Sequence, residues 1–457
     1  MSNKKSIKRI TARGIIGRYD YDINFMTSES NMKAIYSENG HGKTNLLRLI
    51  SYITSYESEG LQKIFSIPFK DIEIYTVLGR VVCIKDGNKT CRIDIYNKET
   101  NEYSMHVLYI NDIKSVTDES LDDEIVKKYQ DIAIGIYAVT GNSVLLSTNR
   151  LNDLDSNSRF ISRARMRRPG LQGSALGEIE DNSAGIIVDA ALYELHNSLV
   201  RNAQRVAIIS RGRRGVYSQI AENKLGSNRR NSQRISAKEA RKDLVGKIDA
   251  IDGIKELVDK YKLINFEEFN SIKDTINRAR TNDTEFKNLH SILIPYFESL
   301  KERIDDIIPA AALIESFIDS INTMFSDKEI RFSIQRGFEI FATDTPESFE
   351  DNGGGGRDIK PSMLSSGEKH LIFLLSKVIV SATREDSLLI IDEPEISLGI
   401  QWQRLLVDYI KECTDGSNLQ IIMATHSPLI LNDYEDIDVS ISENSLISRK
   451  SNTRSAG

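Results

Sequence analysis

Cysteine, long apolar runs and a secretion signal are scarce or absent in this chain of 457 residues. Its three cysteines, Cys83, Cys91 and Cys413, lack the spacing of a metal site. No apolar run reaches the roughly 20 residues that a membrane-spanning helix needs, and the N-terminus shows no apolar segment with a small-residue cleavage site. We therefore expect a cytoplasmic protein with reduced, structural thiols and no membrane contact.

The bulk composition suits a soluble globular protein, because hydrophobic residues make up 40% of the chain and aromatic residues 7%. A chain of this length can bury a large core and form two or three structural units. The net charge of −6 predicts solubility and, by itself, no polyanionic partner.

The first 150 residues are dominated by strand patterns, with one helix expected to open at Thr44. The expected strands lie within residues 7–26, 32–36, 71–112, 131–137 and 144–148. Residues 71–112 alternate apolar and polar side chains between turn signals, which predicts an antiparallel meander. Residues 152–183 are polar and predict a long loop.

The pattern becomes helical at about residue 184 and stays so to about 326. Apolar stripes predict a helical insertion that forms an antiparallel hairpin or a short bundle. A strict heptad does not persist long enough to predict a long coiled coil. The elements expected after the insertion are strands within 329–343, helix 367–382, strand 387–391, helix 400–412 and strand 419–424.

A glycine-rich loop follows the expected strand at 32–36. It runs Ser37-Glu38-Asn39-Gly40-His41-Gly42-Lys43-Thr44-Asn45, with Ser37 in place of the first glycine of the usual phosphate-loop pattern. Glycines let backbone N–H groups approach a phosphate, and the N-terminus of the next helix favours its charge. Lys43 would reach the β- and γ-phosphates, and Thr44 would ligate Mg²⁺. The strand–loop–helix context predicts that residues 39–45 bind ATP.

Two acids stand at the end of a second buried strand. Residues 388–391 are apolar and lead directly into Asp392-Glu393-Pro394. Asp392 would hold Mg²⁺ through water, and Glu393 would orient or deprotonate the attacking water. An apolar strand that ends in two acids can also simply cap the next element, but the glycine-rich loop favours a hydrolytic role.

Two further segments fit the same chemistry. Leu364-Ser365-Ser366-Gly367-Glu368 opens an apolar helix, and the spacing of Ser365 and Glu368 predicts a capping box. The same Ser-Gly helix start suits an anion such as the γ-phosphate of ATP. His426 follows the strand expected at 419–424; a lone histidine is usually structural, but its place after the acid pair favours contact with the γ-phosphate.

The order of these motifs resembles the ABC-type ATPases of the SMC, RecF and OLD-like group. Their Walker A motif, signature, Walker B motif with D-loop, and H-loop are similar to residues 39–44, 364–368, 391–398 and 424–428. The resemblance covers about 7–150 and 329–435. It implies an α/β fold: an ABC-type P-loop ATPase head with a mixed central sheet and an antiparallel β subdomain, split by an α-helical, coiled-coil-like insertion.

The resemblance also implies a division of the chain and an assembly. We expect an N-terminal lobe at 1–183, the helical insertion at 184–327 and a C-terminal lobe at 328–457. ATP and Mg²⁺ are the implied cofactors, and Glu393 and His426 the implied catalytic residues. In this group two protomers sandwich two nucleotides, so a homodimer or a higher homo-oligomer is expected, with Ser397 and Leu398 at its seam.

Within the group, residues 393–398 followed by Trp402-Gln403 look most like the stand-alone ATPases of anti-phage systems such as PARIS and Septu. Size and layout favour the PARIS type, although Gly399-Ile400 departs from the usual pattern. This likeness implies a slow ATPase switch that holds or releases a separate effector nuclease when it senses a phage protein, such as an acidic DNA mimic. The 31 residues after His426 are too few for the Toprim nuclease domain of OLD nucleases.

The rival interpretation is a RecF/SMC-like DNA-repair ATPase that binds duplex DNA. Residues 201–242 hold twelve Lys or Arg against two acids, and five arginines lie within 159–168. Such clusters suit nucleic acid or an acidic protein, although solvated helix faces explain them equally well. Few aromatic residues interleave with them, which argues against stacking on single-stranded bases.

Two family features have only weak candidates. Tyr19 or Tyr21 would stack on the adenine, although packing in the core explains both residues at least as well. Residues 147–150 lie where a loop that senses Mg²⁺ and γ-phosphate is expected, but they lack its usual glutamine.

Overall fold

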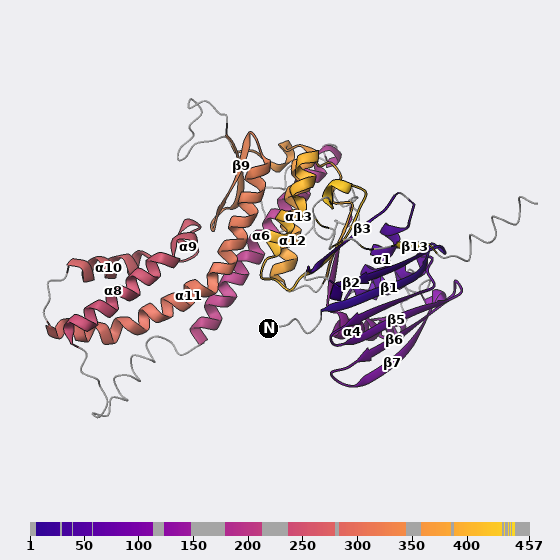
Figure 1. The fold of residues 1–457 in the computed structure, drawn as a ribbon, viewed down its shortest axis with the longest axis horizontal. Coiled ribbons are helices and arrows are strands. Elements are labelled where there is room, and N and C mark those ends of the chain that lie inside the picture. Colours follow the sequence, from indigo (N-terminus) through magenta and orange to yellow (C-terminus); the bar gives the residue numbers. More distant parts are fainter. Residues whose placement is uncertain are drawn as a thin grey trace, which may run out of the picture. The chain divides into compact units, whose positions relative to one another are not determined.

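The chain forms two compact units in the computed structural model (Figure 1). Unit 1 comprises residues 1–190 and 361–457, and unit 2 comprises 191–360. The structure describes residues 6–27, 30–38, 40–56, 58–112, 123–147, 179–212, 236–278, 283–343, 358–384 and 388–431, together with Tyr434, Ile437, Val439 and 441–443.

Unit 1 is built from two sheets and the helices that cover them. Its strands are β1 (Ile7–Ile15), β2 (Tyr19–Asn24), β3 (Met32–Tyr36), β4 (Asp71–Thr76), β5 (Gly79–Asp86), β6 (Thr90–Asn97), β7 (Glu102–Tyr109), β8 (Ser143–Leu146), β11 (Leu388–Asp392), β12 (Gln420–Thr425) and β13 (Ile441–Glu443). Its helices are α1 (Lys43–Thr54), α2 (Ser58–Lys63), α4 (Asp123–Thr140), α12 (Ser366–Thr383) and α13 (Ile400–Thr414). Short 3-10 helices are η1 (Phe25–Thr27), η2 (Ile64–Ser66), η6 (Pro361–Met363) and η7 (Pro428–Ile430).

Four strands form a parallel sheet in the order β3-β12-β11-β8. Every residue of β11 and β12 is buried. Such unbroken apolar runs are expected where helices or a second layer cover both faces of a sheet. Since all four strands run the same way, the segments that follow them leave the sheet at one common edge.

The predicted antiparallel meander is confirmed within a seven-stranded sheet of order β13-β2-β1-β4-β5-β6-β7. The inward side chains of its strands share one core with α1, α4 and the faces of β11 and β12. Figure 1 shows α1 and α4 lying along this sheet. Unit 1 therefore has the two sheet types that the motif order implied, joined by a common apolar core.

One expected strand is a helix. Residues 131–137 fall within α4, although their isoleucines alternate with Ala133 and Gly135 as side chains do along a strand. The buried positions are Ile132, Ala133, Ile136 and Val139, whereas Ile134 is 51% exposed. This is the helical period, and the stripe begins at Tyr129, before the window that suggested a strand. The following strand is present as β8, one residue earlier than expected.

A buried glutamine ties the two sheets of unit 1 together. Gln420 begins β12 and Ile7 begins β1, 413 positions away. The Ile7 N–H donates to Gln420 Oε1 over 2.6 Å, and Gln420 Nε2 donates to the Ile7 carbonyl over 2.8 Å. Both residues are at most 3% exposed. The backbone N–H and carbonyl of Ile7 and the side-chain amide of Gln420 therefore depend on each other for their hydrogen bonds.

Unit 2 is mainly helical, as predicted. Its elements are the C-terminal part of α6 (Ile179–Gly212), α8 (Ala237–Ile254), α9 (Glu256–Lys260), α10 (Glu267–Arg278), α11 (Asp283–Met324), β9 (Lys328–Ser333) and β10 (Gly337–Ala342). α6 begins five residues inside the segment expected to be a loop. α11 continues through Pro295 and Pro309.

The helices of unit 2 form a short bundle, one of the two forms that the periodicity left open. α8, α10 and α11 share one apolar core that includes Ile248, Phe269 and Ile304. Three ion pairs join α8 and α9 to α11, and residue numbers rise together on the two sides. They are Asp243 with His290, Lys247 with Glu298, and Lys260 with Glu315. α11 therefore runs parallel to α8 and α9, and the returning α10 makes this possible. The predicted antiparallel hairpin is not formed by this pair.

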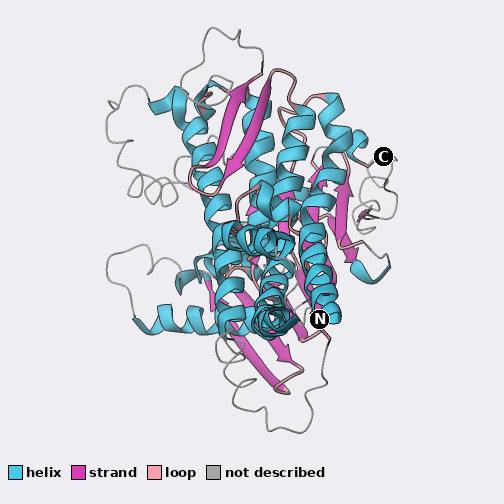
Figure 2. Ribbon diagram, turned by 90° about the vertical axis from the view of Figure 1, so that its left-hand side faces the viewer, coloured by secondary structure: helices cyan, strands magenta, loops and turns pink. Residues whose placement is uncertain are grey.

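Strands β9 and β10 pair as an antiparallel hairpin that belongs to unit 2 (Figure 2). Asn322 of α11 exchanges two hydrogen bonds with the backbone of Ile330, and the ring of Phe338 lies 5.0 Å from that of Phe317. The hairpin thus packs with the insertion. The boundaries at 183/184 and 327/328 stay predictions.

Among the described residues, one stretch, Ile292–Met324 of α11, is long and apolar enough to span a membrane by length and composition. Half of its apolar window is buried inside the structure, as in the core helix of a folded domain. Phe297 and Ile304 supply part of that buried surface.

Removing the side-chain amide of Gln420 should destabilise unit 1. In Gln420→Leu the buried N–H and carbonyl of Ile7 lose their partners, so we expect the free energy of unfolding to fall by about 2–4 kcal/mol. Chemical unfolding followed by circular dichroism measures this change. The matched control is Gln401→Leu on the exposed face of α13, which should change stability by no more than about 0.5 kcal/mol. Equal effects of the two substitutions would mean that the hydrogen bonds between Gln420 and Ile7 do not stabilise unit 1.

Candidate functional site

The carboxyl edge of the parallel sheet collects the predicted motifs. The glycine-rich loop follows β3, His426 follows β12, Glu393 follows β11, and Ser147 follows β8. Ligands of parallel α/β sheets bind at this edge, because side chains from separate loops meet there. The sheet order therefore brings together residues that lie up to about 390 positions apart in the sequence.

The glycine-rich loop needs glycine at two described positions. Gly40 and Gly42 have φ angles of 90° and 79°, in the left-handed region. A Cβ on Gly42 would also lie 2.6 Å from Ile16 Cδ1. Gly42 caps α1 through its backbone, and no side chain caps the start of this helix, so the first-turn N–H groups face the loop. Asn39 lies outside the described residues.

Lys43, the first residue of α1, is buried with its ammonium turned back into the loop. Nζ donates to the Ser37 carbonyl, to Ser37 Oγ at 3.0 Å and to the Glu38 carbonyl at 3.2 Å. Burial lowers the pKa of Lys43, and the negative charges of Glu393 and Asp392 oppose that shift. The amine is held at the mouth of the loop by backbone acceptors and acids.

Lys43, His426 and Glu393 form a chain of polar contacts. Lys43 Nζ lies 3.2 Å from His426 Nδ1, and His426 Nε2 lies 3.4 Å from Glu393 Oε1. An ammonium can only donate, so in the tautomer that lets His426 share a Lys43 proton, Nδ1 is the acceptor and the ring N–H lies on Nε2. That proton points at the carboxylate. The imidazole therefore links the lysine of the glycine-rich loop to the acid expected to be catalytic.

Asp392 and Thr44 provide oxygen atoms of the kind that Mg²⁺ prefers. Thr44 Oγ1 donates to Asp392 Oδ1 over 3.3 Å, and Asp392 is only 6% exposed. Burial raises the pKa of Asp392, and the Thr44 hydrogen bond opposes this rise. The described residues contain no group of three or more His, Cys, Asp or Glu that could hold a metal. One carboxylate and one hydroxyl suit a Mg²⁺ ion that takes its other ligands from water and phosphate.

Glu393 has a left-handed backbone, with φ of 52°. Its N–H donates to the Ala424 carbonyl over 2.8 Å, so the neighbouring strand β12 stabilises this conformation. Ser397 in the same loop is also left-handed, with φ of 66°. Two residues other than glycine in this region within five positions mark a loop whose shape is imposed by its surroundings.

Glu395 connects the same loop to the segment after β12. Its Oε1 accepts from the backbone N–H of His426 over 2.6 Å. Its Oε2 is buried and has no hydrogen-bond partner within the described part of the chain. The acid loop, defined here as residues 392–398, is thus joined to the backbone that carries His426.

The capping box predicted at the start of α12 is present. The Ser365 N–H donates to Glu368 Oε2 over 2.7 Å, and the Glu368 N–H donates to Ser365 Oγ over 3.3 Å. Glu368 is 7% exposed, so its carboxylate serves the cap, whereas Ser365 and Ser366 are exposed. A Cβ on Gly367 would lie 2.6 Å from the Ser397 carbonyl oxygen. The signature helix start and the acid loop are therefore in direct contact.

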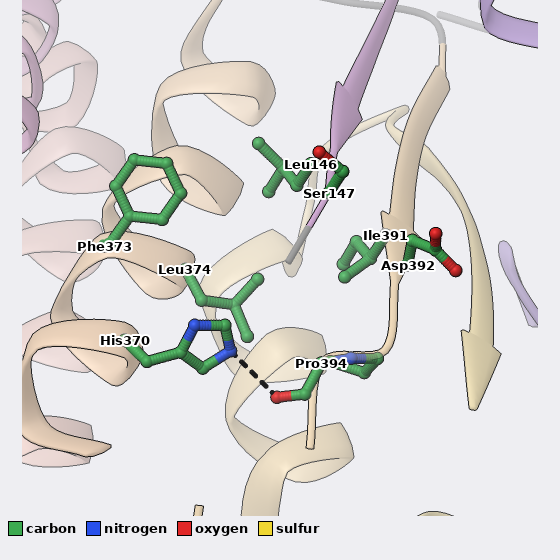
Figure 3. A pocket seen from close by; sticks show the side chains of 8 residues that line it. All are labelled: Leu146, Ser147, His370, Phe373, Leu374, Ile391, Asp392 and Pro394. Carbon is green, nitrogen blue, oxygen red and sulfur yellow. Dashed lines mark hydrogen bonds between the residues drawn. The ribbon is translucent and has the colours of Figure 1, made fainter. Parts of the chain in front are cut away.

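Two side chains that had no predicted role support the acid loop. His370 of α12 bonds the Pro394 carbonyl at 3.0 Å and, with Ser147 and Asp392, lines a small cavity (Figure 3). Gln403 accepts from Ser427 Oγ at 2.7 Å and donates to the Leu398 carbonyl at 2.9 Å. Gln403 belongs to the pattern that resembles defence ATPases, without an assigned contact, and His370 lies outside the quoted motifs. The contacts that give them a role join separate segments of the sequence.

Tyr19 and Tyr21 both pack against the glycine-rich loop. The Tyr21 hydroxyl donates to the His41 carbonyl over 2.6 Å, and the Tyr19 ring meets the His41 ring edge-on at 4.9 Å. Tyr19 is 7% exposed and Tyr21 is 3% exposed. Their observed contacts are those of core residues that support the loop.

Several candidates lie wholly or largely outside the described residues. These are Thr148-Asn149-Arg150, the arginines between 159 and 168, and the central part of 201–242. Asn45 lies in the first turn of α1 and is partly buried.

The geometry matches the fold expected from the sequence. An α/β head with a P-loop at the edge of a parallel sheet, an antiparallel β subdomain and an interrupting helical insertion is the arrangement of an ABC-type ATPase head. The Gly40–Thr44 segment follows β3 and runs into the first turn of α1, and the Asp392–Glu393 pair lies at the end of β11.

A curated relative has 24% identity to this chain over 330 residues: the "Retron Vc95 probable ATPase" of Vibrio cholerae serotype O1 biovar El Tor. The match includes 66% of this chain, and the chain spans 59% of the length of that relative.

Among solved structures, an Smc head domain with an extended coiled coil from Pyrococcus furiosus, bound to the C-terminal domain of ScpA, is similar over 98% of both chains. Its TM-score is 0.40 and its identity 15%. The SMC head domain from Thermotoga maritima is similar over 96% of this chain and 99% of that chain, with a TM-score of 0.33 and 11% identity.

The family match covers more than half of the chain. It spans residues 189–432, which include the signature, the acid loop and His426, and it leaves the glycine-rich loop outside. The chain belongs to the family described as "AAA domain, putative AbiEii toxin, Type IV TA system" and contains an AAA-type ATPase domain.

Proposed function

We propose that unit 1 binds Mg²⁺–ATP and hydrolyses it slowly. The observation that carries this proposal is the polar chain from Lys43 through His426 to Glu393, beside the Thr44–Asp392 pair. Phosphoryl transfer needs positioning and charge stabilisation more than covalent chemistry, and these five side chains supply both.

Each residue has a role that follows from its surroundings. Lys43 would bind the β- and γ-phosphates, and Thr44 and Asp392 would hold Mg²⁺, the ion that neutralises charge on those phosphates. Glu393 would orient the attacking water and accept its proton. His426, with its proton on Nε2, would hold the Glu393 carboxylate and keep it close to the γ-phosphate site.

The signature would act on the nucleotide of a second copy, as the family resemblance implies. Ser365 and Ser366 are exposed at the N-terminus of α12. Nearby segments expose large apolar side chains: Met363 at 60%, Ile396 at 41% and Ile400 at 63%. Exposed apolar groups beside a polar anion site suit burial against another protomer. A homodimer with two shared ATP sites, alone or within a higher oligomer, is the proposed assembly.

In the cell, this chain would be the sensor ATPase of a PARIS-type anti-phage system, located in the cytoplasm. Support comes from the likeness of residues 393–403 to stand-alone defence ATPases, from the family description, and from the similarity to an ATPase named for a retron. The ATP sites would act as a clasp between copies. A separate effector nuclease would be held or released when a phage protein, such as an acidic DNA mimic, is sensed.

A second candidate is a RecF/SMC-like repair ATPase, favoured by the basic composition of residues 201–242. Contacts with DNA phosphates release counterions, so binding through this segment would weaken steeply with salt.

Two substitutions at the ATP site test the clasp. Glu393→Gln should keep ATP binding, lower turnover by at least about 100-fold and trap an ATP-dependent dimer, because the water loses its base. Lys43→Ala should abolish ATP binding and assembly. Light scattering with and without ATP, and steady-state hydrolysis, measure these effects. Glu412→Gln, on the exposed face of α13, is the control. If Glu393→Gln hydrolyses ATP like the wild type, the assigned role of Glu393 is wrong.

The metal role of Thr44 is tested by a pair of substitutions. Thr44→Val keeps the shape but removes Oγ1, so Mg²⁺ should no longer tighten ATP binding, an expected loss of about tenfold or more. Thr44→Ser keeps the hydroxyl and should stay close to the wild type. The measurement is the affinity for a fluorescent ATP analogue with Mg²⁺ and with EDTA. Equal Mg²⁺ dependence in both variants would remove Thr44 from the metal site.

Purification of the tagged protein from its native host separates the two biological candidates. The defence proposal predicts that a nuclease subunit co-purifies and that ATP changes its retention. The repair candidate predicts instead ATP-dependent binding to a DNA duplex, with affinity that falls roughly 10³-fold or more between 50 and 200 mM salt if at least six phosphates are contacted. DNA binding without a nuclease partner would overturn the defence proposal.

A further inference from the structure

The acid loop lies between two structural elements with different expected roles. On one side it contacts α12, whose exposed start would meet the nucleotide of a second copy. On the other side Glu395 binds the backbone N–H of His426, a residue of the chain's own site. In the proposed dimer, residues 392–398 would therefore connect the two ATP sites to which one copy contributes.

The contact with α12 is made at two places. At the helix start, Gly367 approaches the Ser397 carbonyl so closely that a Cβ would lie 2.6 Å from it, and the Trp402 ring covers the same position at 3.3 Å. Three residues further on, nearly one helical turn, His370 reaches the Pro394 carbonyl. The two contacts lie on one face of the helix, because residues three apart are neighbours there.

His370 is buried, with 8% exposure, and its hydrogen bond has a definite direction. A carbonyl oxygen can only accept, so His370 Nε2 carries the proton and donates it to Pro394 over 3.0 Å. Figure 3 shows the ring pointing from α12 to the turn after Asp392, with the hydrogen bond dashed. Burial lowers the pKa of His370, which favours the neutral ring.

The peptide that His370 binds directly follows Glu393, the proposed catalytic base. Pro394 has a fixed φ and no N–H. Its carbonyl oxygen is therefore the backbone group of this residue that can form a hydrogen bond. The preceding residue, Glu393, keeps a left-handed backbone that its surroundings must impose. A shift of α12 would pull on the Pro394 carbonyl and change the direction of the Glu393 carboxylate.

We propose that His370 is a positioning residue that transmits the state of the signature helix, and so of one ATP site, to Glu393 in the other. This proposal rests on the proposed function and names a residue that the family motifs do not include. It predicts that the hydrogen bond matters for turnover, and that ATP binding and assembly depend on it much less.

Three variants of α12 test the role. His370→Leu removes the donor and puts an apolar side chain of similar size in its place. His370→Gln can place an amide N–H near the position of Nε2. Ser376→Ala is the matched control, because Ser376 lies buried on the same helix and has no hydrogen-bond partner among the described residues. The measurements are kcat and KM for ATP, and ATP-dependent dimerisation of each variant combined with Glu393→Gln.

We expect His370→Leu to lower kcat by about tenfold or more, since a small misplacement of a catalytic group has effects of that order, with KM and dimerisation within about twofold of the wild type. His370→Gln should recover most of kcat, and Ser376→Ala should match the wild type. Equal losses in the Leu and Gln variants would mean that the ring acts only by packing and would overturn the proposal, as would a normal kcat in His370→Leu.

Two controls keep the result decisive. If circular dichroism shows that His370→Leu does not fold, His370→Phe, a planar ring without a donor, replaces it under the same criteria. If the wild-type protein hydrolyses no ATP, the proposed function itself fails and this inference falls with it. If the wild type and the His370 variants hydrolyse ATP at the same rate, the role of His370 is wrong while the proposed function stands.

Discussion

The parallel pairing of β3, β12, β11 and β8 is the constraint on which the site depends. Parallel strands end at one edge, so the loops that follow them must meet there, however far apart they lie in the sequence. This explains how the chain tolerates more than 200 intervening residues between β8 and β11. The intervening residues have only to return the chain to β11, the neighbour of β8 in the sheet. The hydrogen bonds between Gln420 and Ile7 join β12 to the second sheet.

Burial of charge at that edge gives the site its chemical character. Desolvation lowers the pKa of Lys43 and raises that of Asp392, so each ionised form is costly without its neighbours. The opposite charges lie close enough to offset part of this cost. His426 stands between the buried amine and Glu393, within 3.2 Å of Lys43 Nζ on one side and 3.4 Å of the Glu393 carboxylate on the other. The residues proposed to bind ATP and those proposed to act in hydrolysis are thus linked by charge and hydrogen bonding.

Local pattern predicted much of the fold and failed where tertiary packing decides. The meander, the helix after the glycine-rich loop and the capping box of Ser365 and Glu368 follow from short-range periodicity and spacing, and all are present. Residues 131–137 were expected to be a strand because their apolar residues alternate, yet they pack on the sheet as α4. The parallel course of α8 and α11 also escaped prediction, because the direction of a packed helix depends on the connection between them.

The sequence by itself determined the motif types, their order and the chemistry that these residue types can perform, because glycine conformation, carboxylate basicity and helix capping are local properties. Only the tertiary structure decided which groups meet. The link from Lys43 to Glu393 through His426, the anchoring of the acid loop by Glu395, and the hydrogen bond from His370 to Pro394 all join segments that are separate in the chain. Such contacts depend on strand order and helix packing, which no local spacing records.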